Sequence, residues 1–146
     1  MSVQWIRRDH RLDLDLAVGL EAGANLLVRA RSARQLDEAV TFNLRLWRAI
    51  RDLALRCPGM GEREFLAGTA DHVAAMLALD AYPSVDPRDM AFVAGRNMAL
   101  AGDLGGPQAC ERHRDTLVAE WAAQHDSPRF EAWLLDRLEA APCPVS

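Results

Sequence analysis

Histidine and cysteine are the side chains with which this sequence could carry out metal or nucleophilic chemistry. Cys110 and His113 lie three residues apart, so a helix would place both on one face. A zinc site needs three or four ligands, and the spacing of His10, His72 and His125 supplies no second pair such as CxxC, HxxxH or HExxH. We therefore expect no metal ion and no other cofactor.

Catalytic sequence motifs are also missing. The sequence has no GxSxG and no GxGxxG, and its 17 basic residues are all arginine, which removes the lysine of a phosphate-binding loop. Asp71 and His72 place an acid beside a base, but adjacent residues of a helix point apart. We expect a protein that is not an enzyme and has no catalytic residues. An enzyme or cofactor binder that uses Cys110, His113 and Trp121, together with His125, stays open as an alternative.

Two asparagines occupy positions where a leucine would pack better. Asn43 and Asn97 lie on the apolar faces of two predicted helices, and a buried amide without partners costs roughly 1–3 kcal/mol. Each could be a hydrogen-bonded group that fixes how helices align. The two could instead face each other or bond to a break in the backbone, or they could contact a partner.

Tryptophan and arginine supply the other candidates for partner contact. Trp47 shares the apolar face of Asn43, where it is either core or a binding anchor. Trp121 and Trp133 lie in the last two predicted helices, where they either close the domain or form a docking surface. The candidate partner-binding residues are Asn43, Arg45, Trp47, Asn97, Trp121 and Trp133.

Helices must position all of these residues, because alanine and leucine are abundant and β-branched residues are few. Apolar periodicity predicts helices over residues 14–31, 33–56, 62–80, 87–104 and 107–124, and a last helix after 127–128. We interpret the alternating residues 11–16 as a frayed arm that enters the first helix. In that helix, Gly19 and Gly23 either allow a neighbouring helix to pack closely or are simply tolerated without a structural role. In the third helix we expect Phe65 to point inward and His72 to be half-buried.

The predicted fold is an all-α bundle of about four core helices plus two short C-terminal helices. Gly105, Gly106 and Pro107 end the fourth helix and start a new unit. We therefore divide the chain into a bundle over 1–106 and a C-terminal helical extension over 107–146 that packs on the same domain. Two prolines, Pro142 and Pro144, predict a loose tail.

Composition and charge narrow the function classes. Half of the residues are hydrophobic and the net charge is −4, which excludes a disordered chain. No uncharged apolar stretch reaches 18 residues, so we expect no membrane span, and the N-terminus lacks the apolar region of a signal peptide. Arginines alternate with acids, which argues against a nucleic-acid partner, although Arg45, Arg48 and Arg56 could form a local basic face. Three cysteines at irregular spacing predict no disulfide framework and a cytoplasmic location.

Two stretches resemble one known family. Residues 36–49, LDEAVTFNLRLWRA, contain an N-x-R-L-W pattern like that of FlaF, the flagellar biosynthesis regulator family of alphaproteobacteria. Residues 92–104, FVAGRNMALAGDL, are similar to the final helix of that family. The resemblance covers about residues 20–106.

The resemblance implies a small, all-helical, cytoplasmic and non-enzymatic protein. FlaF proteins are needed for flagellin production and export, act opposite the translational regulator FlbT, and are thought to bind flagellin. An amphipathic helical segment of flagellin could be shielded in an apolar groove of such a bundle. The alternative is a generic helical adaptor for protein–protein interaction, unrelated to flagella.

Overall fold

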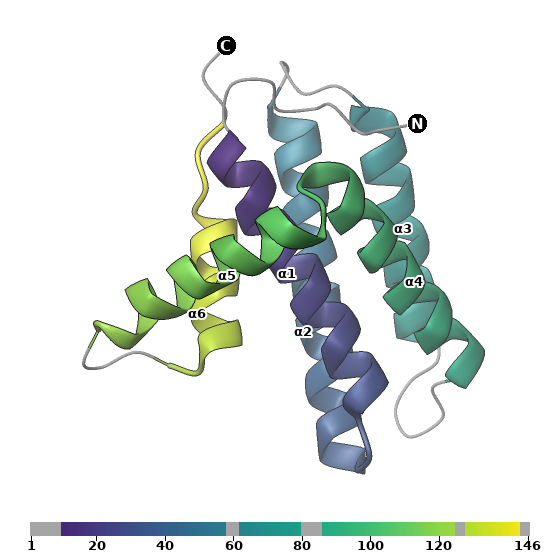
Figure 1. Cartoon of the computed structure of the whole chain (residues 1–146). Helices are drawn as coiled ribbons and strands as arrows, with labels where there is room; N and C mark the ends of the chain where they lie inside the picture. Colours follow the sequence, from purple (N-terminus) through teal and green to yellow (C-terminus); the bar gives the residue numbers. More distant parts are fainter. Residues whose placement is uncertain (1–9, 58–61, 80–85, 125–127, 144–146) are drawn as a thin grey trace.

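Helices account for nearly all of the structure. The computed structural model describes residues 10–57, 62–79, 86–124 and 128–143, and within these ranges it contains six helices and no strand (Figure 1). The helices are α1 (His10–Arg29), α2 (Ala33–Arg56), α3 (Arg63–Leu79), α4 (Pro87–Leu104), α5 (Pro107–Ala122) and α6 (Phe130–Glu139). The predicted all-α bundle is confirmed. Across the described ranges, no helix combines the length and apolarity that a membrane crossing requires.

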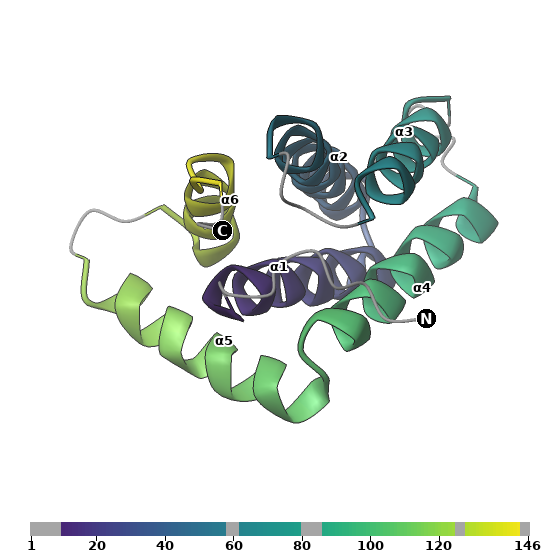
Figure 2. The same cartoon turned by 90° about the horizontal axis from the view of Figure 1, so that it is seen from above.

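Helix α1 is the centre of the bundle. It contacts α2, α4, α5 and α6, whereas α3 packs mainly on α2. Figure 2 shows α1 in the middle, with α4 and α5 along one side and α2 and α6 on the other. Leu16, Leu20 and Leu27 recur at helical spacing and are buried on α1. At Gly19 a Cβ atom would lie 3.0 Å from Leu138 and 3.2 Å from Leu46, so this glycine serves close packing of α1 against α2 and α6.

The start of α1 differs from the sequence prediction. Residues 10–13 are helical rather than a frayed arm. The alternation of charged and leucine residues over 11–16 is also compatible with a helix, because Leu12 and Leu16 lie four residues apart and are both buried in the core. Arg11 adds an ion pair with Glu120 of α5.

The inward face of α3 is narrower than predicted. Leu66, Val73 and Leu77 are buried against the bundle, but Phe65 is 48% exposed. His72 is exposed rather than half-buried, and its ring centroid lies 5.5 Å from that of Phe92 on α4. Both expectations were wrong because α3 packs mainly on α2, so the rest of its surface faces solvent.

A tight turn brings the C-terminal helices back onto the bundle. Gly106 has a φ of +77°, a conformation that favours glycine, and Pro107 follows as the first residue of α5. α5 then packs along α1, and α6 packs on α1 and α2 through buried Leu134, Leu135 and Leu138. The described residues of 107–143 therefore complete the same core.

Candidate functional site

A buried hydrogen-bonded cluster joins α2 and α4, and the sequence-predicted residues Asn43, Trp47 and Asn97 form it. Trp47 Nε1 donates to Asn97 Oδ1 at 2.8 Å, and Asn97 Nδ2 donates to Asn43 Oδ1 at 2.8 Å. Asn97 Nδ2 also donates to the carbonyl of Leu20 on α1 at 3.2 Å. The two asparagines thus face each other, as one of the interpretations of the sequence had it.

The backbone of α1 and α2 completes this cluster. Asn43 Nδ2 donates to the carbonyls of Gly23 at 3.1 Å and Ala39 at 2.8 Å. A Cβ atom at Gly23 would lie 2.6 Å from Asn43 Oδ1, so only glycine leaves room for the amide. Asn43 and Asn97 are both 0% exposed, so they do not contact a partner directly. They could affect partner binding only by holding α2 in place.

A groove opens beside this cluster, where α1, α2 and α6 meet. It has a volume of about 280 Å³. Half-buried Leu26 and the small exposed parts of Phe42 (5%) and Leu135 (3%) form its apolar floor, and Thr41 and Ala132 also line it. Charged side chains also line it: Asp37, Glu38, Arg45, Arg129 and Glu131. An apolar floor with charges of both signs at the edge suits one face of an amphipathic helix.

A second hollow of about 380 Å³ continues the groove along α1. The two hollows share Leu26 and Glu131 in their linings. Ala22 and Phe130 add apolar surface to the second, and it is closed by polar side chains, among them Arg114. Together the hollows follow α1 past the N-terminal end of α6.

Arg45 connects the groove to α6. Its Nη2 atom lies 3.3 Å from Asp136 Oδ1 and also donates to Glu139 Oε1. Arg56 is likewise engaged, through Asp52 and the carbonyl of Ala141. Two arginines of the possible basic face are thus held in local contacts, and the third, Arg48, is exposed.

The tryptophans of the last two helices close the α5–α6 hairpin. Trp121 and Trp133 are half-buried and flank Phe130, with ring centroids 5.8 and 5.9 Å from it. Trp121 Nε1 donates to the carbonyl of Pro128 at 2.7 Å, and the Arg137 guanidinium lies 5.8 Å from the Trp133 ring centre. Of these aromatic rings, Phe130 reaches the hollow beside α1.

Cys110 and His113 both face α1, and each is bonded to a carboxylate there. Cys110 Sγ donates to Glu21 Oε2 at 3.1 Å, and burial raises the pKa of this thiol to about 12, so it stays protonated. His113 Nε2 lies 2.6 Å from Asp15 Oδ1. A protonated thiol is a poor nucleophile and a poor metal ligand.

Metal-ligating groups are sparse in the described residues, where no three His, Cys, Asp or Glu side chains are placed to hold an ion. His125 and the side chain of His10 lie outside what the structure describes.

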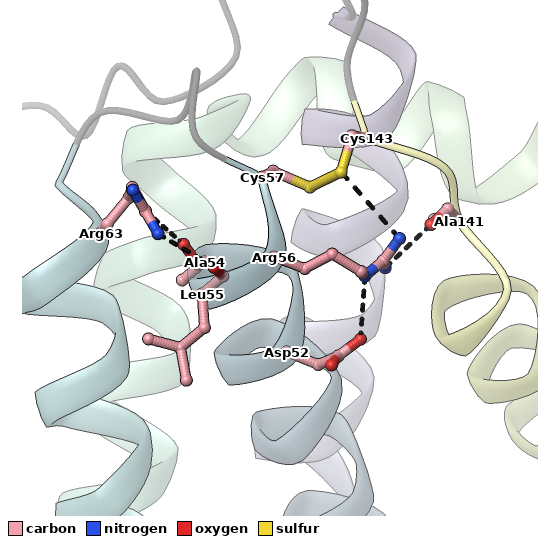
Figure 3. Close-up of a disulfide and its surroundings, with 8 residues drawn as sticks. All are labelled: Asp52, Ala54, Leu55, Arg56, Cys57, Arg63, Ala141 and Cys143. Carbon is pink, nitrogen blue, oxygen red and sulfur yellow. Dashed lines mark hydrogen bonds and ion pairs between the residues drawn. A yellow bond between two sulfur atoms is a disulfide. The ribbon is translucent and has the colours of Figure 1, made fainter.

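A disulfide joins Cys57 to Cys143, which the sequence analysis did not expect (Figure 3). The Cα atoms lie 5.4 Å apart although 86 residues separate the two in the chain. Residues 140–143 are therefore tied to α2 rather than loose, and Arg56 adds a hydrogen bond to the carbonyl of Ala141 at 3.1 Å. The prediction was wrong because an odd cysteine count says nothing about a pair that the fold brings together.

The sequence led us to expect an apolar groove but did not show where it lies. Phe42 and Thr41 were assigned to no site because they lie beside the main apolar face of α2. Ala132 and Leu135 come from α6, whose position depends on tertiary packing. The one available signal was the width of the apolar face of α2, which extends from Ala39 through Phe42 to Leu46.

Comparisons with protein-family models, with curated proteins and with solved structures give no match for this chain.

Proposed function

We propose that this chain is a non-enzymatic, cytoplasmic flagellar biosynthesis regulator that binds an amphipathic helical segment of flagellin as an export chaperone. The groove between α1, α2 and α6 is the observation that carries the proposal. Its apolar surface from Leu26, Phe42 and Leu135 suits the apolar face of a helix, and Arg45 and Glu38 at its edge suit charged flanks.

The resemblance to FlaF supports flagellin as the partner. The two stretches that carry it supply all three side chains of the buried cluster, Asn43 and Trp47 from one and Asn97 from the other. A direct hydrogen-bonded contact gives a physical reason why these residue types occur together. FlbT is the second partner that the resemblance suggests, and a generic helical adaptor remains the alternative function.

Filling the groove tests the proposal. Thr41 is exposed on α2 and lines the groove, so Thr41→Trp should block a helix without disturbing the core. Thr116 is equally exposed but lies on α5, away from the groove, so Thr116→Trp is the matched control. Each variant is co-expressed with the cognate flagellin, and the complex is captured at several salt concentrations.

We expect wild type and Thr116→Trp to retain flagellin, and Thr41→Trp to lose most of it. If wild type captures no flagellin at any salt concentration, flagellin is not the partner. If Thr41→Trp binds as wild type does, the groove is not the site.

A further inference from the structure

The Cys57–Cys143 bridge fastens the segment after α6 to the end of α2 (Figure 3). Cys57 is the C-cap of α2 and only 1% exposed. Cys143 is half-buried and lies four residues beyond the end of α6. Cys143 is therefore the more accessible partner of the bridge.

Arg56 lies against the accessible sulfur. Its Nη1 atom is 4.0 Å from Cys143 Sγ, while its other nitrogens bond to Asp52 and to the carbonyl of Ala141. A cation beside a cysteine favours its thiolate form. The positive charge of Arg56 attracts an incoming thiolate to Cys143 and, in the second step of exchange, stabilises Cys143 as the leaving thiolate, so Arg56 favours exchange at Cys143.

The third cysteine does not compete for this exchange. Cys110 is buried, and its thiol donates to Glu21. Burial raises the pKa of Cys110 to about 12, which leaves almost no thiolate at neutral pH. Exchange is thus confined to the Cys57–Cys143 pair.

We propose that Cys57 and Cys143 form an exchangeable dithiol–disulfide site that controls how firmly α6 is docked. A thiolate of an external dithiol attacks Cys143 Sγ, the S–S bond breaks, and Cys57 leaves as a thiolate that takes up a proton from water. The second thiolate of the reductant then attacks its own sulfur in the mixed disulfide and releases Cys143 as a thiolate beside Arg56. Two electrons pass to the protein, and the dithiol becomes a disulfide.

Reduction removes one attachment of α6 and leaves its buried residues Leu134, Leu135 and Leu138 and the ion pairs of Arg45 and Arg137 to hold it. α6 has 10 residues, too few for a stable helix on its own. Leu134 and Leu138 pack near Gly19 of α1, and Arg45 adds ion pairs that are open to solvent. In a reducing compartment such a bridge is usually transient and redox-sensing, which is the behaviour proposed here.

The groove makes this site relevant to partner binding. Ala132 and Leu135 of α6 form part of its wall, so loosening α6 widens it. This consequence rests on the proposed function, but the exchange itself does not.

Hydrogen exchange of the full-length chain, followed by mass spectrometry, tests the proposal. Wild type is measured oxidised and after reduction with dithiothreitol, beside Cys143→Ser and the control Cys110→Ser. We expect amides of α6 to exchange about tenfold faster or more once the bridge is open, and those of α4 to remain unchanged. Oxidised Cys110→Ser should match oxidised wild type.

The rate of reduction tests the role of Arg56. Arg56→Gln should be reduced by dithiothreitol about threefold more slowly than wild type, and the exposed neighbour Arg48→Gln at the wild-type rate. Equal exchange of α6 in oxidised and reduced wild type would overturn the proposal, even if Cys143→Ser failed to fold. So would a bridge that resists millimolar dithiothreitol for a day. Neither result depends on flagellin, so the proposed function would stand or fall separately.

Discussion

Two clusters of polar side chains contact α1, and they hold their neighbouring helices in different ways. The cluster of Asn43, Trp47 and Asn97 is neutral and fully buried, with each amide bonded to another side chain or to the backbone. The cluster toward α5 and α6 is charged, with Asp15 bonded to both His113 and Arg137. The neutral cluster links α1, α2 and α4 through uncharged groups, whereas the attachments of α5 and α6 include ion pairs and a disulfide besides their buried leucines.

The α1–α2–α4 region and the α5–α6 region therefore contribute differently to the groove. A rigid α1–α2–α4 unit supplies one wall of the groove, with Phe42 directly beside Asn43. The other wall comes from α6, whose attachments include solvent-exposed ion pairs and the disulfide. A binding site with one fixed wall and one adjustable wall can close on a helix after it enters.

The largest expected effect comes from the neutral cluster. Trp47→Ala should lower the free energy of unfolding by roughly 3–5 kcal/mol, because it leaves a cavity and removes the donor to Asn97. Trp133→Ala, at a half-buried site on α6, should cost about half as much. Urea denaturation measures both, and equal losses would erase the distinction between the two regions.

Asn43→Leu should destabilise the protein by about 1–3 kcal/mol, because Asn97 Nδ2 loses one of its two acceptors inside the core and the Gly23 carbonyl loses its donor. Asn25→Leu is the matched control, since Asn25 is half-buried in the second hollow on α1, and it should be close to neutral. The same urea titration applies. An Asn43→Leu protein as stable as wild type would mean that the amide cluster does not stabilise the fold.

A smaller effect is expected at Arg45. Arg45→Gln removes the ion pairs to Asp136 and Glu139, which are open to solvent, and should cost less than about 1 kcal/mol, with the loss shrinking at high salt. Arg51→Gln, which breaks an exposed pair with Asp71 on α3, should behave alike in stability. Only Arg45→Gln should speed hydrogen exchange in α6; an equal effect of both variants there would contradict local docking by Arg45.

The smallest effect concerns pH. A hydrogen bond from Arg11 lowers the pKa of Glu120 below its ordinary value of 4.5. Its contribution to stability is therefore complete above about pH 4.5 and is lost as the pH falls through the lowered pKa. Urea titrations from pH 7 to pH 3 should show a flatter profile for Glu120→Gln than for the exposed control Glu111→Gln. Identical profiles would mean that Glu120 does not contribute to the loss of stability at low pH.

Local signals explain what the sequence predicted correctly. The range 33–56 of α2 was right because Ser32 caps its start, accepting from the Gln35 amide, and Cys57 is its C-cap. Asn43 and Asn97 stood out because amides on apolar faces need partners.

Long-range packing explains what the sequence could not predict. The Cys57–Cys143 pair depends on α6 returning to the end of α2, across 86 residues. Phe65 looks like a core residue by type, and only the arrangement of α3 on the outside of α2 exposes it. The groove likewise exists only once α6 is docked.

The central claim is that a partner helix binds in the groove, and it is tested most directly by locating the binding site. Isotope-labelled protein is titrated with a synthetic peptide of the terminal helical segment of the cognate flagellin, and backbone amide shifts are followed by NMR. If the groove is the binding site, perturbations should be centred on Thr41, Arg45 and Ala132, around the groove. Perturbations confined to the outer faces of α3 and α4, or none at millimolar peptide, would contradict it.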